Sequence, residues 1–364
     1  MNSNAISTRQ LCFILAFFLP VNKLAILPSV LANYAGNDLL IAALLPLVLQ
    51  GGVIFGLLWL MQKREQTLFE MIEEKFGNTV ARVCYFILAV YFAFSALLPL
   101  AEHKIYIEYI MYDSLPSLLI FLPFFFFSTY AAAKGLNSTG RAADVGMPLV
   151  LFSLPILLFM AIASADFTSL LPVGRTPFGD ILQGSTSILS WCSEGAWLLL
   201  FLGNVKPERR FLLKTSLSYV FGALILLVFL AIFYGIFSTV AINESFAVAK
   251  IARYYNALKT LGRVDYLFIY ILSLLQLFAL TVPLQLSVQS LKKCFNSDMV
   301  SLFSLIVNGA ILAVIILTAQ SFPVLERVIN GYLFPVFLVF ANLIPLLCLL
   351  FAIKKKPKRK DSSV

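Results

Sequence analysis

Residues 19–28 read Leu-Pro-Val-Asn-Lys-Leu-Ala-Ile-Leu-Pro and form a polar break inside the first long apolar run of the chain, residues 11–32. A run of this length and apolarity is long enough to cross a lipid bilayer. Proline removes a backbone donor and clashes with the preceding turn, so Pro20 predicts a break in the helix. An unpaired ammonium at this depth costs about 2.5–3.5 kcal/mol or more, so Lys23 requires a partner elsewhere in the chain.

The composition is that of an integral membrane protein. Of the 364 residues, 60% are hydrophobic and 12% are charged, whereas a soluble protein is typically about 25% charged. Apolar runs recur along the chain and predict ten membrane spans, at about 10–33, 39–61, 80–101, 116–133, 146–165, 181–203, 213–240, 264–291, 298–320 and 332–353. The net charge of +9 arises from basic loops and from the tail 354–364, which should bind anionic lipid, so no nucleic-acid partner is expected.

The distribution of Lys and Arg predicts that both ends of the chain are cytoplasmic. With the N-terminus inside, 19 of the 27 basic residues lie in inner segments, 7 lie in outer segments, and Lys23 lies within the membrane. The inner segment 63–77 has apolar residues at helical spacing and ends at Gly77, which predicts an amphipathic surface helix. The outer loop 241–263 forms either an interfacial or re-entrant helix over the extracellular mouth or a simple connecting helix.

Ten spans divide into two halves of five, residues 10–165 and 181–353, within a single domain of residues 1–364. Because five is odd, the second half must enter the membrane with opposite polarity, as inverted repeats do. The sixth run contains residues 184–195, Gly-Ser-Thr-Ser-Ile-Leu-Ser-Trp-Cys-Ser-Glu-Gly, which are small and polar for a membrane segment. Interrupted runs at matching positions in two halves point to a transporter's binding site, here between spans one and six.

The predicted site is centred on Lys23 and Glu194. These residues either hold a ligand or proton between them or form a structural pair that fixes spans one and six together. The polar side chains that flank the two breaks either bind the ligand or make helix–helix hydrogen bonds worth about 1 kcal/mol each. Gln276 lies nearer mid-membrane than Gln285, and Tyr91 either walls a cavity with Phe94 and Ser95 or only packs. The predicted ligand-binding residues are Pro20, Asn22, Lys23, Tyr91, Ser190, Ser193, Glu194 and Gln276.

Other chemistry is not indicated by the sequence. It contains no nucleophile–base constellation, no metal-ligand or disulfide spacing among its five cysteines, and no cofactor motif, so an enzyme is not expected. Glu102, His103, Lys104 and Glu108 cluster at the outer end of span three. There His103 either tunes pH sensitivity or belongs to a solvated loop end.

Several short motifs occur in an order and spacing that resemble a known family. They are Ser7-Thr8-Arg9-Gln10-Leu11, Leu27-Pro28-Ser29, Lys134-Gly135-Leu136 with Arg141, Glu194, Arg263-Val264-Asp265, Gln276 and Leu291-Lys292-Lys293. Nearly end to end, the chain resembles the B subunit of bacterial spore germinant receptors, a branch of the amino acid–polyamine–organocation transporter superfamily. The resemblance implies an all-α, LeuT-like fold with two inverted five-helix repeats, broken helices one and six, and a nutrient site between them.

The resemblance also implies partners and a role. The partners are a receptor A subunit with a membrane-embedded part and a lipoprotein C subunit, in the spore inner membrane, where nutrient binding signals germination. In one departure, the family commonly has Gly-x-Gly where this chain has Val21-Asn22-Lys23. That difference implies either a ligand with an extra carboxylate or a lysine that fills the site. The alternatives are an autonomous proton- or ion-coupled amino acid permease and a structural subunit that binds nothing.

Overall fold

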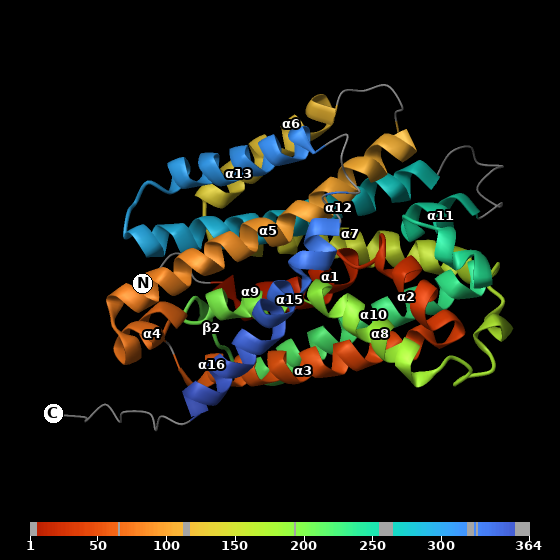
Figure 1. Ribbon diagram of the computed structural model, residues 1–364, viewed down its shortest axis with the longest axis horizontal. Coiled ribbons are helices and arrows are strands. Elements are labelled where there is room, and N and C mark those ends of the chain that lie inside the picture. The colour runs from red at the N-terminus through yellow and green to blue at the C-terminus, as the bar shows by residue number, and fades with distance from the viewer. Residues whose placement is uncertain are drawn as a thin grey trace.

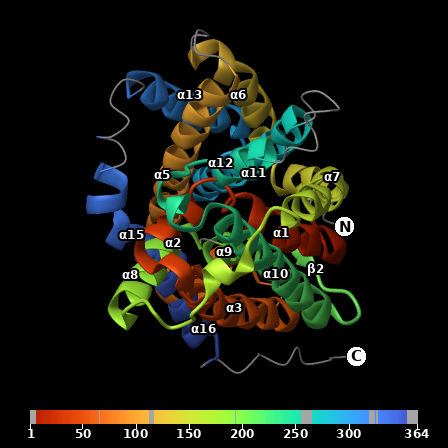
Figure 2. The ribbon, with the colours of Figure 1, turned by 90° about the vertical axis from the view of Figure 1, so that its right-hand side faces the viewer.

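The computed structural model describes residues 6–64, 66–111, 117–192, 194–254, 265–318, 324 and 327–353. Its long helices run roughly parallel to one axis in Figure 1, and Figure 2 shows the bundle along that axis. Within these described residues, six helical segments are long and apolar enough to cross a membrane. The protein is therefore an all-α, multi-pass membrane protein, as predicted. The six segments are Leu27–Lys63, Asn78–Ile107, Leu136–Ile162, Phe211–Asn243, Leu267–Phe295 and Val300–Leu317.

Both predicted helix breaks are present. The first run consists of α1 (Thr8–Val21) and α2 (Leu27–Ala35), and the sixth consists of α8 (Phe178–Ile188), the 3₁₀ turn η3 (Leu189–Trp191) and α9 (Glu194–Phe201). The number of membrane crossings stays a prediction, but helical segments lie at each of the other eight predicted runs. These helices are α3 (Leu39–Lys63), α5 (Asn78–Met111), α6 (Ser117–Ala133), α7 (Leu136–Ile162), α10 (Phe211–Phe237), α12 (Asp265–Phe295), α13 (Val300–Leu317), and α15 (Phe334–Leu338) with α16 (Ile344–Ile353).

Two shorter helices lie in the connections. The predicted amphipathic helix is α4 (Leu68–Phe76); Thr67 caps its start, and Gly77, with φ +89°, follows its end. In the outer loop, α11 (Ala247–Tyr254) packs on α12 and α7, so this part of the loop is a packed helix. Residues 255–263 of the same loop lie outside the described residues.

Helices that hold equivalent places in the two predicted halves pack against each other. Thus α3 lies along α10, α5 along α12, and α6 along α13, as Figure 1 shows. The second arm of the first run, α2, packs on the first arm of the sixth, α8. Within each half, the last run packs on the first, since α7 packs on α1 and α16 packs on α9. This arrangement brings the two breaks together inside the bundle.

One end of the bundle is tied together by the first residues of the chain. The strand β1 (Ile6–Ser7) pairs in parallel with β2 (Val205–Lys206), and Ser7 and Gln10 form a capping box at the start of α1. Gln10 also donates from Nε2 to Asp144 Oδ2 of α7 at 2.9 Å, and Arg9 Nη2 lies 3.1 Å from Asp144 Oδ1. The start of α1, the end of the sixth run and α7 are therefore held together here, at the left of Figure 1.

Candidate ligand site

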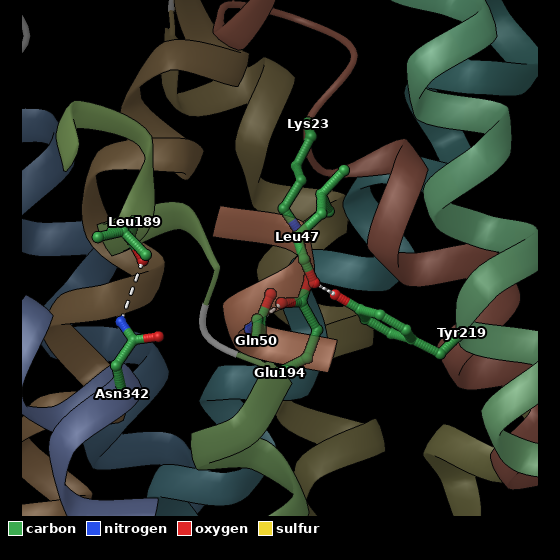
Figure 3. A network of polar contacts seen from close by, with 7 residues as sticks. All are labelled: Lys23, Leu47, Gln50, Leu189, Glu194, Tyr219 and Asn342. Carbon is green, nitrogen blue, oxygen red and sulfur yellow. Dashed lines mark hydrogen bonds and ion pairs between the residues drawn. The ribbon is translucent and has the colours of Figure 1, made fainter. Parts of the chain in front are cut away.

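A buried ion pair joins the two helix breaks. Pro20 lies in the last turn of α1, and the backbone N–H of Lys23 bonds to the Pro20 carbonyl at 2.9 Å, which closes a turn that does not continue as helix. The Lys23 side chain reaches Glu194, the first residue of α9, and forms an ion pair with it (Figure 3). Lys23 is 2% exposed and Glu194 is 4% exposed. The predicted contact between these residues is present.

One further helix contacts this pair directly, and two others make hydrogen bonds near it. Gln50 of α3 donates from Nε2 to Glu194 Oε2 at 2.7 Å, so both carboxylate oxygens of Glu194 accept bonds from protein groups. The hydroxyl of Tyr219 in α10 donates to the carbonyl of Leu47 in α3 at 2.7 Å, as Figure 3 shows. In the last run, a π-helical turn, η7 (Val339–Leu343), carries Asn342, whose Nδ2 lies 3.4 Å from the Leu189 carbonyl beside the break.

Sequence reasoning missed Gln50, although a signal for it existed. Gln50 is the one strongly polar side chain in the predicted span 39–61. A polar side chain inside a membrane span generally faces other protein groups, so it was a candidate partner for a buried charge. In the structure it is fully buried at the ion pair.

A cavity of about 80 Å³ lies between the two breaks, α5, α12 and the last run. One water needs about 10–15 Å³ on this measure, so the space exceeds that of a single water several-fold. Five aromatic residues contribute to its wall, namely Phe94, Trp191, Trp197, Phe334 and Phe337. Its polar lining residues are Asn22, Ser95, Glu102 and Gln276.

Of the predicted site residues, Asn22 and Gln276 line this cavity, while Lys23 and Glu194 are engaged in the adjacent ion pair. Tyr91 packs instead, because its ring stacks on Phe340 with centroids 4.9 Å apart. Pro20 ends α1 and is not among the lining residues. Ser193 and the side chain of Ser190 lie outside the described residues. Which of these residues bind a ligand stays a prediction.

Two cavity-lining side chains carry unsatisfied polar atoms. Nε1 of Trp197 and Oδ1 of Asn22 are buried and have no hydrogen-bond partner among the described residues. Ser95, by contrast, donates to the Phe92 carbonyl of its own helix at 2.9 Å. Trp197 was missed by sequence reasoning, although Trp191 lies in the break of the sixth run and Trp197 follows it closely.

Two residues of the cluster at the end of span three, His103 and Lys104, are buried inside the protein. Helix α5 continues to Met111, past the predicted end at residue 101, because residues 102–111 contain no helix breaker. His103 is 1% exposed, and its Nε2 lies 3.0 Å from Ser273 Oγ of α12. Lys104 is buried as well, so the interpretation of these two residues as a solvated loop end is wrong. Gln285, a second glutamine of span eight, donates from Nε2 to Ser138 Oγ at 3.0 Å.

A larger hollow, of about 630 Å³, adjoins the cavity and is termed the vestibule below. The helices α2 and α8 line it, and in Figure 1 both helices lie toward the end of the bundle opposite to β2. Trp191 and Phe334 line both the cavity and the vestibule, so these two aromatic side chains stand between them. The polar lining residues of the vestibule are Ser29, Asn33, Tyr34, Gln183, Thr186 and Ser187.

Comparison with known protein families gives one result that bears on function. A family model described as spore germination protein matches residues 5–323. The match covers both helix breaks and the α5 and α12 walls of the cavity, whereas Phe334 and Phe337 lie beyond it. Comparison with individual curated proteins gives no match.

Proposed function

The chain belongs to the family of spore germination proteins, and from this premise we propose that it is a nutrient-sensing subunit of a spore germinant receptor. The germinant, a small amino-acid-like molecule, binds in the cavity between the two helix breaks. The observation that carries the proposal is the position of that cavity, where both interrupted runs meet within the bundle. Broken helices supply unpaired amide and carbonyl groups there, which suit a small polar ligand.

The fold in this proposal is a LeuT-like one with ten crossings in two inverted repeats. The helix pairs support it, because α3 with α10, α5 with α12 and α6 with α13 are each fifth neighbours in the order of runs. A two-fold axis between two halves requires such self-equivalent contacts near the axis, as in an isologous interface. Both termini are cytoplasmic in this arrangement, in agreement with the positive-inside bias.

Signalling then proceeds by a shift of population between two arrangements of the halves. The ligand enters from the vestibule past Trp191 and Phe334, while the opposite end is held by the β1–β2 pair. Bound ligand favours one arrangement to the extent that it binds that arrangement more tightly. Receptor A and C subunits in the spore inner membrane read the change.

The buried Lys23–Glu194 pair favours a second candidate, an autonomous proton- or ion-coupled amino acid permease, because intramembrane carboxylates often carry coupling protons. Uptake of a labelled nutrient by proteoliposomes that contain this chain alone separates the two. Accumulation driven by an imposed proton or ion gradient supports the permease. Nutrient-dependent germination without uptake supports the sensor.

The test of the sensor uses spores whose only germinant receptor contains this subunit. Ser95→Phe fills the cavity and removes only a bond within its own helix. Ser301→Phe, on the exposed face of α13, is the matched control. At equal protein level, we expect Ser95→Phe to raise the nutrient concentration for half-maximal germination by about tenfold or more, through lost binding. An unchanged response in Ser95→Phe would overturn the proposed site.

A further inference from the structure

The last run of the chain is interrupted on both sides of the short helix α15. Within the described residues, a π-helical turn, η6 (Val328–Tyr332), precedes α15, and the π-helical turn η7 follows it. Such turns are rare, they bend the helices that contain them, and they often occur at functional sites. Helix α15 is therefore a short rigid segment with an irregular turn at each end.

Two prolines weaken the helix at these turns. Pro335 lies in the first turn of α15, and Pro345 lies in the first turn of α16. Proline has no N–H to donate, and its ring clashes with the carbonyl of the fourth residue before it. These carbonyls belong to Gly331 and Ala341, which lie within η6 and η7. Each turn thus lacks a regular helical hydrogen bond, so the chain bends there at lower cost than in an unbroken helix.

The inner face of α15 forms part of the cavity wall. Phe334 and Phe337 line the cavity, and α15 packs on η3 in the break of the sixth run. The outer face is open, since Val336 is 47% exposed and Figure 2 shows α15 at the edge of the bundle. Beyond η7, by contrast, α16 is fixed, because a Cβ added at Gly56 of α3 would lie only 2.7 Å from Leu349. An outward movement of α15 therefore meets no protein at Val336 and leaves α16 in place.

The size of the cavity gives such a movement a role. The cavity of about 80 Å³ is small, since an engineered cavity of about 150 Å³ holds one benzene molecule. A larger molecule enters only if part of the wall moves. The two breaks are fixed to each other by the Lys23–Glu194 pair, and α5 and α12 pack along each other as long helices. Helix α15 is therefore the part of the wall that is most free to move.

We propose that α15 is a hinged wall of the cavity, which moves outward about η6 and η7 and so adjusts the volume of the cavity to the ligand. In the closed position seen here, the Tyr91 ring of α5 stacks on Phe340 of η7 and lies 5.7 Å from the ring of Phe337. The role in fitting ligands of different size rests on the proposed function, whereas the movement of α15 does not.

Distances between spin labels test the movement in the purified full-length chain, in detergent and without nutrient. All five native cysteines are replaced by alanine, and labels are attached through Ser301→Cys in α13 with either Val336→Cys in α15 or Leu346→Cys in α16, which are exposed positions. We expect double electron–electron resonance to give a broader distance distribution for the pair 301–336 than for the pair 301–346. Equal widths would show that α15 is fixed and would overturn the inference.

Pro335→Ala combined with Pro345→Ala restores both N–H donors and removes both ring clashes, so this double variant should stiffen the two turns. It should narrow the 301–336 distribution and leave the 301–346 distribution unchanged. Pro123→Ala in α6, a helix that does not line the cavity, is the matched control and should change neither distribution. A 301–336 distribution that stays broad in the double variant would show that the two turns are not the hinges.

Thiol reagents of graded size test the link to cavity volume. Ser95→Cys, in the same background without native cysteines, places a thiol on the cavity wall. The rate of reaction with a reagent too large for the closed cavity scales with the population of the open arrangement. We therefore expect the double proline variant to slow benzyl methanethiosulfonate by about fivefold or more and to leave methyl methanethiosulfonate unchanged. Equal effects on the two reagents would overturn the role of α15 in setting the volume.

Failure of this inference and failure of the proposed function are distinguishable, because neither measurement uses a nutrient. A fixed α15 overturns the hinge even if Ser95→Phe shifts the nutrient response of spores. A mobile α15 that controls entry of the larger reagent upholds the hinge, and an unchanged spore response to Ser95→Phe would then overturn the proposed function alone.

Discussion

Removal of one charge from the buried ion pair gives the sharpest test of the site. Glu194→Gln leaves the ammonium of Lys23, whose side chain is 1% exposed, without its counter-ion. Breaking a buried pair in this way costs about 3–5 kcal/mol of folding free energy. Lys23→Met should cost a similar amount, because the carboxylate of Glu194 then keeps only the 2.7 Å bond from Gln50 among the bonds described above.

The double variant Lys23→Met with Glu194→Gln removes both charges and keeps an acceptor for Gln50. Replacement of a buried pair by neutral groups of similar volume is often neutral or stabilising, so we expect a stability within about 1–2 kcal/mol of the unmodified chain. The two single losses therefore should not add. The stability loss of the double variant minus the sum of the two single losses is the coupling free energy of the pair.

Thermal unfolding of the full-length chain in detergent measures these effects, with a thiol-reactive dye as the reporter. Cys192 lies beside the ion pair and is 1% exposed, whereas the other four cysteines are partly exposed and are replaced by alanine in every chain compared, so the dye reacts only when the break opens. The single variants should unfold at lower temperature, and the double variant close to the unmodified chain. Losses that simply add in the double variant would refute the argument, because they would show that the charges do not interact.

The same variants decide between the structural and the ligand-binding interpretations of Lys23 and Glu194. If the double variant is stable and spores that carry it respond normally to nutrient, the pair is structural. A stable double variant with a shifted nutrient response would place the pair in the ligand mechanism.

Three further substitutions test the packing around the site. Gly222→Ala in α10 places a methyl group 2.9 Å from the Leu15 carbonyl of α1 and should lower the free energy of unfolding by about 1–3 kcal/mol. The added methyl of Gly52→Ala meets nothing within 4 Å, so this variant should raise the free energy of unfolding by about 0.5–1 kcal/mol. An equal effect of both variants on the unfolding temperature would contradict this. Asp38→Ala removes the acceptor of two backbone N–H groups in the loop 174–176, at 2.6 and 2.8 Å. Protease should therefore cleave that loop faster in the detergent-purified chain. An unchanged cleavage rate would mean that Asp38 does not hold the loop. Tyr219→Phe removes the 2.7 Å bond to the Leu47 carbonyl and should lower stability by about 0.5–1.5 kcal/mol, a loss too small to abolish accumulation of the protein in the membrane.

Much of the architecture follows from the sequence because the bilayer restricts what a chain can do. Backbone groups in lipid must be bonded internally, so long apolar runs predict helices, and polar residues with proline predict breaks. An ammonium within a membrane segment requires a partner, and the one carboxylate in a comparable break, Glu194, is the partner that the structure provides. The end of the surface helix at Gly77 was likewise readable from local sequence.

The wall of the cavity was only partly readable. Ser95, Leu98 and Glu102 follow helical spacing on α5 and line the cavity, and Tyr91 continues the same stripe. The cavity nevertheless ends before Tyr91, because Phe340 of the last run covers its ring. Spacing along one helix thus selects a face, while the extent of the cavity along that face depends on a distant segment.

The sequence by itself determined that this is a broken-helix membrane protein in which Lys23 and Glu194 must meet. Only the tertiary structure decided that their ion pair lies beside the cavity and leaves its lining to other residues. The physical reason is that residues 22–26 are not helical, so no periodicity fixes the directions of their side chains. Packing of α3, α9 and α10 sets those directions, and it leaves Asn22 and Trp197 each with a buried polar atom that has no partner among the described residues.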